Sequence, residues 1–212
     1  MKILTEPEAE QLLSEYLPIA KSILTKKIEE AKTFAKKTKY PVMLKLISPE
    51  ALHKTEFRGV RKVDDPEDLK REFQELSTLA KKKRFRSHQI LVQEFMQGRE
   101  VIIGLKKDPT FGHVILFGIG GIFVEAIKDV SFRVCPITTK DAEEMIEELK
   151  AKKVLFGFRG MKPVNINFLK KMLITTSKIP ETHPEIQELD INPFIINEKT
   201  GKVVDARAVI QR

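Results

Sequence analysis

The sequence has 212 residues, of which 42% are hydrophobic, so the chain can bury a core as one large domain or two small lobes. Its formal net charge of +8 permits nucleic acid as a partner and equally suits nucleotide and phosphate ligands. No apolar stretch is long enough to span a bilayer, which argues against a membrane-spanning protein. The N-terminus lacks the hydrophobic stretch of a signal peptide, which argues against a secreted protein, and the only cysteine, Cys135, cannot form an internal disulfide. We therefore expect a cytoplasmic protein in which Cys135 is a small core residue.

The first elements are two helices around a short strand. Thr5 is placed to cap a helix whose apolar residues fall on one face and which ends before Pro18. A strand is expected at about 19–24, and Thr25 is expected to cap a helix over about 26–39. Lysines crowd the polar faces of that second helix, which is typical of a solvated surface; nucleic-acid binding is the minority interpretation.

Lys45 stands inside the apolar segment VMLKLI at 42–47, which predicts a buried strand. Alternation places Lys45 on the face opposite Leu44 and Leu46. A lysine there needs an anionic partner or a route to solvent. A bound phosphate and a structural carboxylate satisfy that need equally well.

A polar loop, 48–58, follows and contains His53. A second strand is expected at 59–63, so the two strands form a hairpin whose loop holds a histidine and several cations. A single loop histidine is more often incidental than catalytic. Its unperturbed pKa of about 6.5 nevertheless leaves a nucleophilic neutral fraction at neutral pH.

The middle of the chain predicts one helix and a run of strands. Asp65 is placed to cap a helix over about 66–83, whose basic C-terminal end suits the helix dipole. Strands are expected at 90–96, 99–106 and 114–117, joined by short turns as an antiparallel meander.

A glycine-rich segment follows the third of these strands. Gly118, Gly120 and Gly121 can bring the backbone close to a ligand, and successive N–H groups in such a loop can bind an anion. Charged residues follow at 125–133 and favour a phosphate-handling loop. A tight turn between two strands is the alternative.

The last third predicts two helices and a hairpin. The helices are expected over about 140–151, capped by Thr139, and around 166–173, with a loop at 156–160 between them. In the hairpin of 186–197 and 203–207, Asp190, Asn192 and Asp205 offer the oxygen ligands that Mg²⁺ prefers. Ordinary turn chemistry at Asn192 is the alternative.

Seven segments in this order resemble one family along nearly the whole chain. They are YPVMLK (40–45), LHK (52–54), GREV (98–101), FGIGGIFVE (117–125), KDVSFRV (128–134), ELDINP (188–193) and DAR (205–207). The family is the ATP-grasp β subunit of ADP-forming acetyl-CoA synthetases, also called NDP-forming acyl-CoA ligases, which are related to succinyl-CoA synthetase.

This resemblance implies an α+β ATP-grasp fold, a single domain over 1–212 in which two lobes grip a nucleotide. The smaller lobe is expected at about 20–90 and the larger one at about 1–19 and 91–212. The implied reaction converts acyl-CoA, ADP and phosphate reversibly into the free acid, CoA and ATP. The implied partner is a CoA-binding α subunit in an α2β2 assembly, without nucleic acid or membrane.

The family pattern also assigns roles residue by residue. His53 matches a phosphorylated histidine, the last relay before ADP. The other matches are ligands of the nucleotide, of the phosphohistidine or of Mg²⁺: Lys45 and Gly59 for phosphates, the backbone of Glu94, Phe95 and Met96 for adenine, Glu100 for ribose, Gly120, Gly121 and Glu125 for the phosphohistidine site, and Asn192 and Asp205 for the metal, with Asp190 behind them.

One departure affects the phosphate site. The family usually has Gly-Gly-Val where this chain has Arg58-Gly59-Val60, so Arg58 either replaces a backbone contact with phosphate or crowds the phosphate.

Two functions are alternatives to that of an acyl-CoA ligase β subunit. They are a free-standing ATP-grasp ligase that joins a carboxylate to an amine or thiol, and a non-enzymatic basic binding module.

Overall fold

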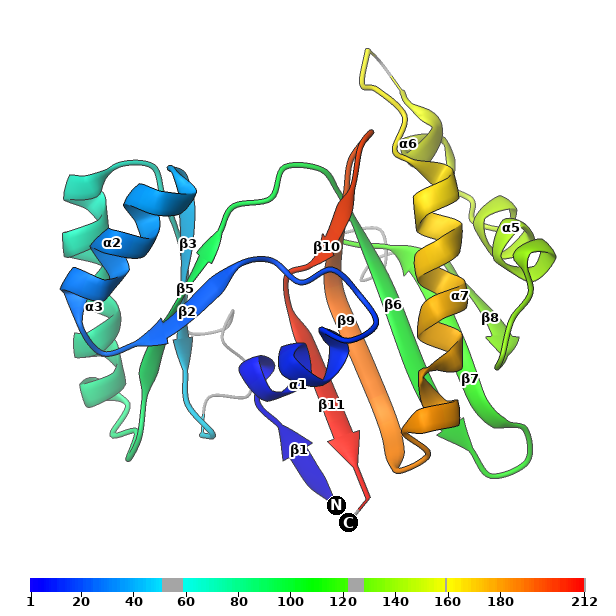
Figure 1. Ribbon diagram of the computed structural model, residues 1–212, viewed down its shortest axis with the longest axis horizontal. Coiled ribbons are helices and arrows are strands. Elements are labelled where there is room, and N and C mark those ends of the chain that lie inside the picture. The colour runs from blue at the N-terminus through cyan, green and yellow to red at the C-terminus, as the bar shows by residue number, and fades with distance from the viewer. Residues whose placement is uncertain (51–58, 122–127, 159, 212) are drawn as a thin grey trace. The chain divides into compact units, whose positions relative to one another are not determined.

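The computed structural model describes residues 1–50, 59–121, 128–158 and 160–211, which fold as two compact units (Figure 1). The smaller unit is the continuous segment Ala20–Phe95, and the larger unit combines Met1–Ile19 with Met96–Arg212. Each unit encloses a hydrophobic core of its own. The smaller unit is thus an insertion between the first helix of the larger unit and the rest of it.

The smaller unit is a four-stranded antiparallel sheet with two helices on one face (Figure 1). The strand order is β2-β5-β3-β4. The elements are β2 (Ser22–Thr25), α2 (Ile28–Thr38), β3 (Val42–Ile47), β4 (Val60–Val63), α3 (Pro66–Lys82) and β5 (Gln89–Glu94). The predicted hairpin is confirmed, because β3 pairs with β4, with Lys45 opposite Val60.

The two helix caps predicted in this unit had different outcomes. Asp65 caps α3 as expected, since its carboxylate accepts hydrogen bonds of 2.9 Å from the N–H groups of Glu67 and Asp68. Thr25 does not cap α2, whose N-cap is Lys27. The Thr25 hydroxyl instead accepts from the Lys27 N–H at 2.9 Å, in a turn that precedes the helix.

The larger unit is a seven-stranded sheet with the order β1-β11-β9-β6-β7-β8, in which β10 also pairs with β9. Helices α1, α5 and α7 cover one face and enclose the core (Figure 1). The strands are β1 (Lys2–Leu4), β6 (Arg99–Asp108), β7 (Gly112–Ile119), β8 (Val130–Val134), β9 (Ile186–Ile196), β10 (Gly201–Val203) and β11 (Ala206–Ile210). The helices are α1 (Glu6–Leu13), α5 (Thr139–Glu147), α6 (Lys153–Phe156) and α7 (Ile166–Thr182).

The predicted meander is wrong at its first strand. β5 pairs with β2 and β3 in the smaller unit, whereas β6 pairs with β7 and β9 in the larger one. The turn signal after residue 96 marks the passage from one unit to the other instead of a hairpin turn. Only the β6–β7 part of the meander is present.

Other boundaries also differ from expectation. The cap of α5 is Thr138 instead of Thr139, and α7 continues to Thr182. A short helix that was not predicted, α6, ends at Phe156, the first residue of the expected loop. β1 and β8 were not predicted. Within the described residues, no helix is long and apolar enough to cross a membrane.

Candidate functional site

Lys45 and Gly59 lie together at the start of the β3–β4 hairpin. The Lys45 side chain is 3% exposed, and Lys45 lies opposite Val60 on β4. The carbonyl of Gly59 accepts a hydrogen bond of 2.8 Å from the N–H of Leu46, the residue after the lysine. Lys45 has an interaction partner inside the chain, as a structural cation does, and it lies beside Gly59, the other residue predicted to bind phosphate.

The segment 94–96 joins the two units, and its last two residues offer free backbone groups. The Glu94 carboxylate accepts a hydrogen bond of 2.6 Å from the N–H of Lys21, so this side chain holds the start of β2 in place. Among the described residues, the backbone N–H and C=O groups of Phe95 and Met96 have no hydrogen-bond partner. An adenine edge needs one donor and one acceptor of this kind.

Glu100 and the glycine-rich segment are neighbours in the larger unit. The N–H of Gly120 donates to the carbonyl of Glu100 at 2.8 Å. A Cβ atom at Gly120 would lie 3.0 Å from the Glu100 backbone, and one at Gly121 would lie 3.7 Å from Oε2 of the Glu100 carboxylate. Gly121 has a φ of +69°, which favours glycine. The exposed Glu100 carboxylate therefore lies directly beside the glycine turn.

Asn192 and Asp205 are also held side by side. Asn192 lies on β9, and its N–H donates to the carbonyl of Asp205 at 3.0 Å. Asp205 occupies the connection between β10 and β11, where the backbone also bonds to the Pro193 carbonyl. Two oxygen-bearing side chains thus start from adjoining backbone positions at one place in the sheet.

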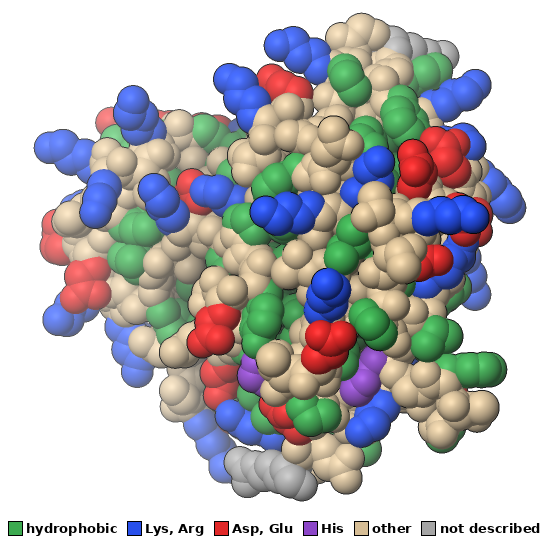
Figure 2. All heavy atoms as spheres, turned by 45° about the vertical axis from the view of Figure 1, so that its right-hand side comes forward, with side chains coloured by type: hydrophobic (Ala, Val, Ile, Leu, Met, Phe, Trp, Pro, Cys, Tyr) green, Lys and Arg blue, Asp and Glu red, His purple; other side chains and the backbone are tan. Residues whose placement is uncertain are grey.

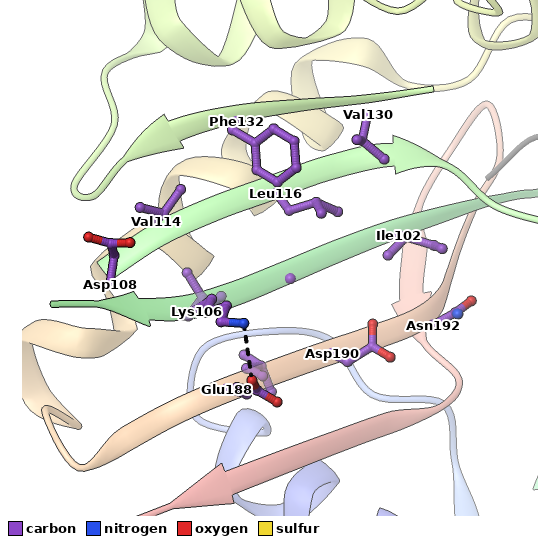
Figure 3. Close-up of a pocket in the computed structure, with 13 residues that line it drawn as sticks. Ile102, Lys106, Asp108, Val114, Leu116, Val130, Phe132, Glu188, Asp190 and Asn192 are labelled. Atoms are coloured by element: carbon purple, nitrogen blue, oxygen red, sulfur yellow. Dashed lines mark ion pairs between the residues drawn. The ribbon is translucent and has the colours of Figure 1, made fainter. Parts of the chain in front are cut away.

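The carboxyl group of Asp190 lies two residues before Asn192, on the same face of β9 (Figure 3). Desolvation raises its pKa above the ordinary value, Glu188 adds to this effect, and Arg207 opposes it. Within the described ranges, no group of three or more His, Cys, Asp or Glu residues is arranged to hold a metal ion. A cation between Asn192 and Asp205 needs further oxygen ligands from phosphate or water, as Mg²⁺ commonly has.

The last part of the charged run after the glycine segment has a structural role. Val130–Val134 form β8, and alternate side chains of this strand point toward α5. The Ser131 hydroxyl donates to the Met145 carbonyl at 2.9 Å, and the Arg133 guanidinium contacts the carboxylates of Glu144 and Glu148. The part of the phosphate-loop interpretation that rested on Ser131 and Arg133 is therefore wrong, since both hold a helix against the sheet.

Three predicted residues have no structural test. His53, Arg58 and Glu125 lie outside the described residues, so their roles stay predictions. Cys135 is described and is half-buried against the core of the larger unit. Burial raises the pKa of its thiol to about 12, in agreement with a structural cysteine.

A cavity of about 580 Å³ lies in the larger unit, on the sheet face opposite α7 (Figure 3). Side chains from four strands line it, among them Ile102 of β6, Leu116 of β7, Phe132 of β8 and Asp190 and Asn192 of β9. The sequence interpretation missed its apolar part. The sequence of β8 contains a pattern that predicts this apolar part, because its apolar residues alternate with the polar residues that face α5.

Comparisons with known proteins agree over the whole chain. Residues 1–210 match the family model described as "ATP-grasp domain". The chain is 42% identical over 98% of its length to the acetate–CoA ligase [ADP-forming] II subunit beta of Pyrococcus furiosus, of which it covers 92%. It is 43% identical over 96% of its length to an acetate–CoA ligase [ADP-forming] of Methanocaldococcus jannaschii, but covers only 30% of that longer protein.

Among solved structures, the chain resembles acetyl-coenzyme A synthetase 1 of Ca. Korarchaeum cryptofilum. The TM-score is 0.85 at 42% identity, with 99% of this chain and 93% of that chain covered. That structure contains coenzyme A and Mg-AMPPCP, with a phosphohistidine segment pointing towards the nucleotide binding site. The predicted fold, an α+β ATP-grasp domain, is confirmed.

Proposed function

The chain belongs to the ATP-grasp family of ADP-forming acyl-CoA ligase β subunits, and from that premise we propose that it makes ATP from ADP with a phosphoryl group received from a CoA-binding partner. The overall reaction converts acyl-CoA, ADP and phosphate into the free acid, CoA and ATP. The pairing of Asn192 with Asp205 carries the proposal, because it sets two oxygen-bearing side chains at one position in the sheet of the larger unit.

Residues of both units bind the nucleotide in this proposal. Lys45 and the backbone at Gly59 contact phosphate oxygens, and the free N–H and C=O groups of Phe95 and Met96 bind the adenine edge. The Glu100 carboxylate accepts hydrogen bonds from the ribose hydroxyls. Each role matches the chemistry available at that position: a buried cation, unpaired backbone groups and an exposed carboxylate.

Asn192 and Asp205 would hold Mg²⁺, with Asp190 behind them. Bound Mg²⁺ supplies positive charge to the phosphate oxygens. Two oxygen ligands from the protein suit this ion, since it usually keeps water and substrate phosphate in its remaining positions. The residues present therefore fit the group.

His53 is the last relay. One of its imidazole nitrogens attacks the phosphorus of the partner's phosphohistidine, which breaks a P–N bond and forms another. A terminal phosphate oxygen of ADP then attacks the same phosphorus, which forms the P–O bond of ATP and returns free imidazole. Transfer between such groups depends mainly on positioning and on cations around the phosphoryl oxygens. Gly120, Gly121 and Glu125 shape the receiving site.

The partner is a CoA-binding α subunit in an α2β2 assembly, and the reaction takes place in the cytoplasm. The β-subunit name of the Pyrococcus relative and the much longer Methanocaldococcus relative support a partner or a fused equivalent. The single cysteine fits a reducing compartment. No role for nucleic acid or membrane is included.

The test combines binding with phosphorylation. Isolated chain is titrated with ADP with and without Mg²⁺ by calorimetry, and we expect binding that weakens at least tenfold in Asn192→Ala and Asp205→Ala. The chain is then mixed with the CoA-binding subunit of the same organism, acetyl-CoA and radiolabelled phosphate. Acid-labile label is expected on wild-type chain and is expected to be absent from His53→Ala.

His88→Ala is the matched control, because His88 is a partly exposed histidine of the smaller unit and its replacement should leave the label intact. Label that persists in His53→Ala would remove the relay role. Turnover by the isolated chain with a carboxylate and an amine or thiol would favour the free-standing ligase. Tight, salt-sensitive oligonucleotide binding without Mg-ADP binding would favour the basic module.

A further inference from the structure

Strand β8 is apolar on the face that none of the described helices covers. Ser131 and Arg133 point toward α5, so the alternate residues Val130, Phe132 and Val134 point to the opposite face. Phe132 is 53% and Val134 50% exposed. An antiparallel strand with one solvated face normally has polar residues on that face, so the exposed apolar side chains of β8 depart from the usual pattern.

The apolar character continues across neighbouring strands. Leu116 on β7 lies directly opposite Phe132, and Val114 lies opposite Val134. On β6, Gly104 lies opposite Leu116 and has Asp190 of β9 on its other side. These pairings make a row across the sheet that runs from a carboxylate through a glycine to two large apolar side chains.

Gly104 creates the hollow in this row. It has no side chain between Leu116 and Asp190, and an added Cβ would meet only ordinary contacts, the nearest being the Leu189 carbonyl oxygen at 3.4 Å and Leu116 Cβ at 3.7 Å. The glycine therefore is not required by close packing at that point. It leaves open part of the cavity of about 580 Å³ (Figure 3).

The β9 side of the cavity is acidic. Glu188 pairs with Lys106 at 3.6 Å, while Asp190 and Asp108 also line the cavity (Figure 3). Glu188 and Asp190 thus place two carboxylates on the β9 side, while Lys106 and Asp108 belong to β6. A complementary surface has large apolar side chains over β7 and β8 and basic side chains over β9.

We propose that the apolar face, defined here as Gly104, Leu116, Val130, Phe132 and Val134, is the docking surface for the CoA-binding partner. This inference rests on the proposed function. The match covers only 30% of the Methanocaldococcus relative, so most of that protein lies outside the matched part, and the Pyrococcus relative of similar length is named a β subunit. Both relatives support a partner, separate or fused, that contacts this domain. The apolar face adjoins Asn192, which lines the same cavity, so a partner docked there reaches the proposed metal ligands.

Two variants test the surface in opposite ways. Phe132→Ser removes an exposed apolar side chain, and Gly104→Val fills the hollow with a residue that strands favour. Each full-length variant is titrated with the CoA-binding subunit of the same organism by calorimetry. We expect the dissociation constant to rise at least tenfold, which is typical for the loss of a central interface contact. Hydrogen exchange at 130–134 should slow in the wild-type complex.

Phe156→Ser is the matched control, since Phe156 is 44% exposed on α6 and lies outside the apolar face. All three variants should bind Mg-ADP as the wild-type chain does. Wild-type chain that fails to bind Mg-ADP contradicts the proposed function itself. Normal Mg-ADP binding combined with unchanged partner affinity in both face variants overturns only the docking surface. Self-association of wild-type chain that Phe132→Ser abolishes overturns it too, because a second copy then covers the face.

Discussion

Asp129 shows how one side chain fixes a connection between elements. Its carboxylate is 6% exposed and accepts hydrogen bonds from the N–H of Lys150 at 2.9 Å and of Ala151 at 2.8 Å. These two N–H groups lie between α5 and α6, where no helical carbonyl is available to them. The aspartate thus ties the start of β8 to a turn more than twenty residues later.

Asp129→Ala is expected to destabilise the protein strongly. The change leaves two backbone donors of the α5–α6 connection without their acceptor, which costs about 2–4 kcal/mol of unfolding free energy. Denaturant-induced unfolding, followed by circular dichroism, measures the difference. Asp64→Ala is the control, because Asp64 only pairs with Lys62 at the surface, and this pair is worth less than about 1 kcal/mol. Equal losses in the two variants would contradict the role of Asp129.

At the scale of elements, α1 begins with a capping box that is sensitive to pH. The Glu8 carboxylate accepts hydrogen bonds of 2.8 Å from the Lys2 ammonium, the Thr5 N–H and the Thr5 hydroxyl. The bond from Lys2 is the largest cause, followed by those from Thr5, of a fall in the pKa of Glu8 from 4.5 to about 2. The folded state therefore favours the ionised carboxylate.

The sign of the pH dependence follows from this lowered pKa. Ionised Glu8 stabilises the folded state fully above pH 4.5, and the contribution is lost as the pH falls toward 2. Because the side chain is 43% exposed, we expect only about 0.5–1 kcal/mol at pH 7. The difference in unfolding free energy between wild type and Glu8→Gln should shrink between pH 4.5 and 2. Glu15→Gln, at an exposed position after α1, should show no such trend. If the difference in unfolding free energy between wild type and Glu8→Gln stayed constant across this pH range, the capping role of Glu8 would be contradicted.

Elements with strong local signals were predicted well from the sequence. The β3–β4 hairpin and α3 have an apolar pattern and a cap that agree with their tertiary surroundings. β1 was missed because three residues are too few to show a period. β8 was missed because its charged residues suggested a ligand loop, although they alternate with apolar ones. The β5–β6 error has another cause: a short turn does not reveal whether the next strand joins the same sheet.

The candidate site was predictable only in parts. Family segments led to Glu100, Asn192 and Asp205, and the structure adds that the last two are hydrogen-bonded neighbours and that Gly121 lies beside Glu100. The apolar face was not predicted, since it depends on which residues of four strands stand opposite one another. Register of this kind arises from pairing between distant segments and leaves no local signal.

At the scale of the whole molecule, charge is divided unequally between the units. The smaller unit contains 19 of the 38 Lys and Arg residues but only 11 of the 30 Asp and Glu residues, so it carries the entire net charge of +8. The larger unit has 19 of each and is formally neutral. Figure 2 shows basic side chains spread over the visible surface, with acidic ones among them. Positive charge on one unit attracts anionic nucleotides from a distance.

Association with Mg-ADP should therefore depend on salt and on the smaller unit. We expect the association rate to fall several-fold between about 20 and 300 mM salt in stopped-flow measurements. Replacing Lys81, Lys82 and Lys83 with Gln should lower the rate at low salt and flatten this dependence.

The matched control replaces three lysines of the larger unit, Lys171, Lys178 and Lys199, and changes the total charge by the same amount. A smaller effect is expected from this control. Equal effects of the two triple variants would mean that total charge alone governs the encounter, and that the uneven distribution has no kinetic role.

The pairing of β1 with β11 has a consequence for biosynthesis. Lys2 lies opposite Ile210, whereas the smaller unit uses only residues 20–95. A ribosome adds roughly 5–20 residues per second, so the first strand emerges on the order of 10–40 seconds before its neighbour exists. The smaller unit can mature while translation continues. The larger unit closes its sheet only after β11 has been made, and until then β1 of a nascent chain lacks the strand with which it pairs.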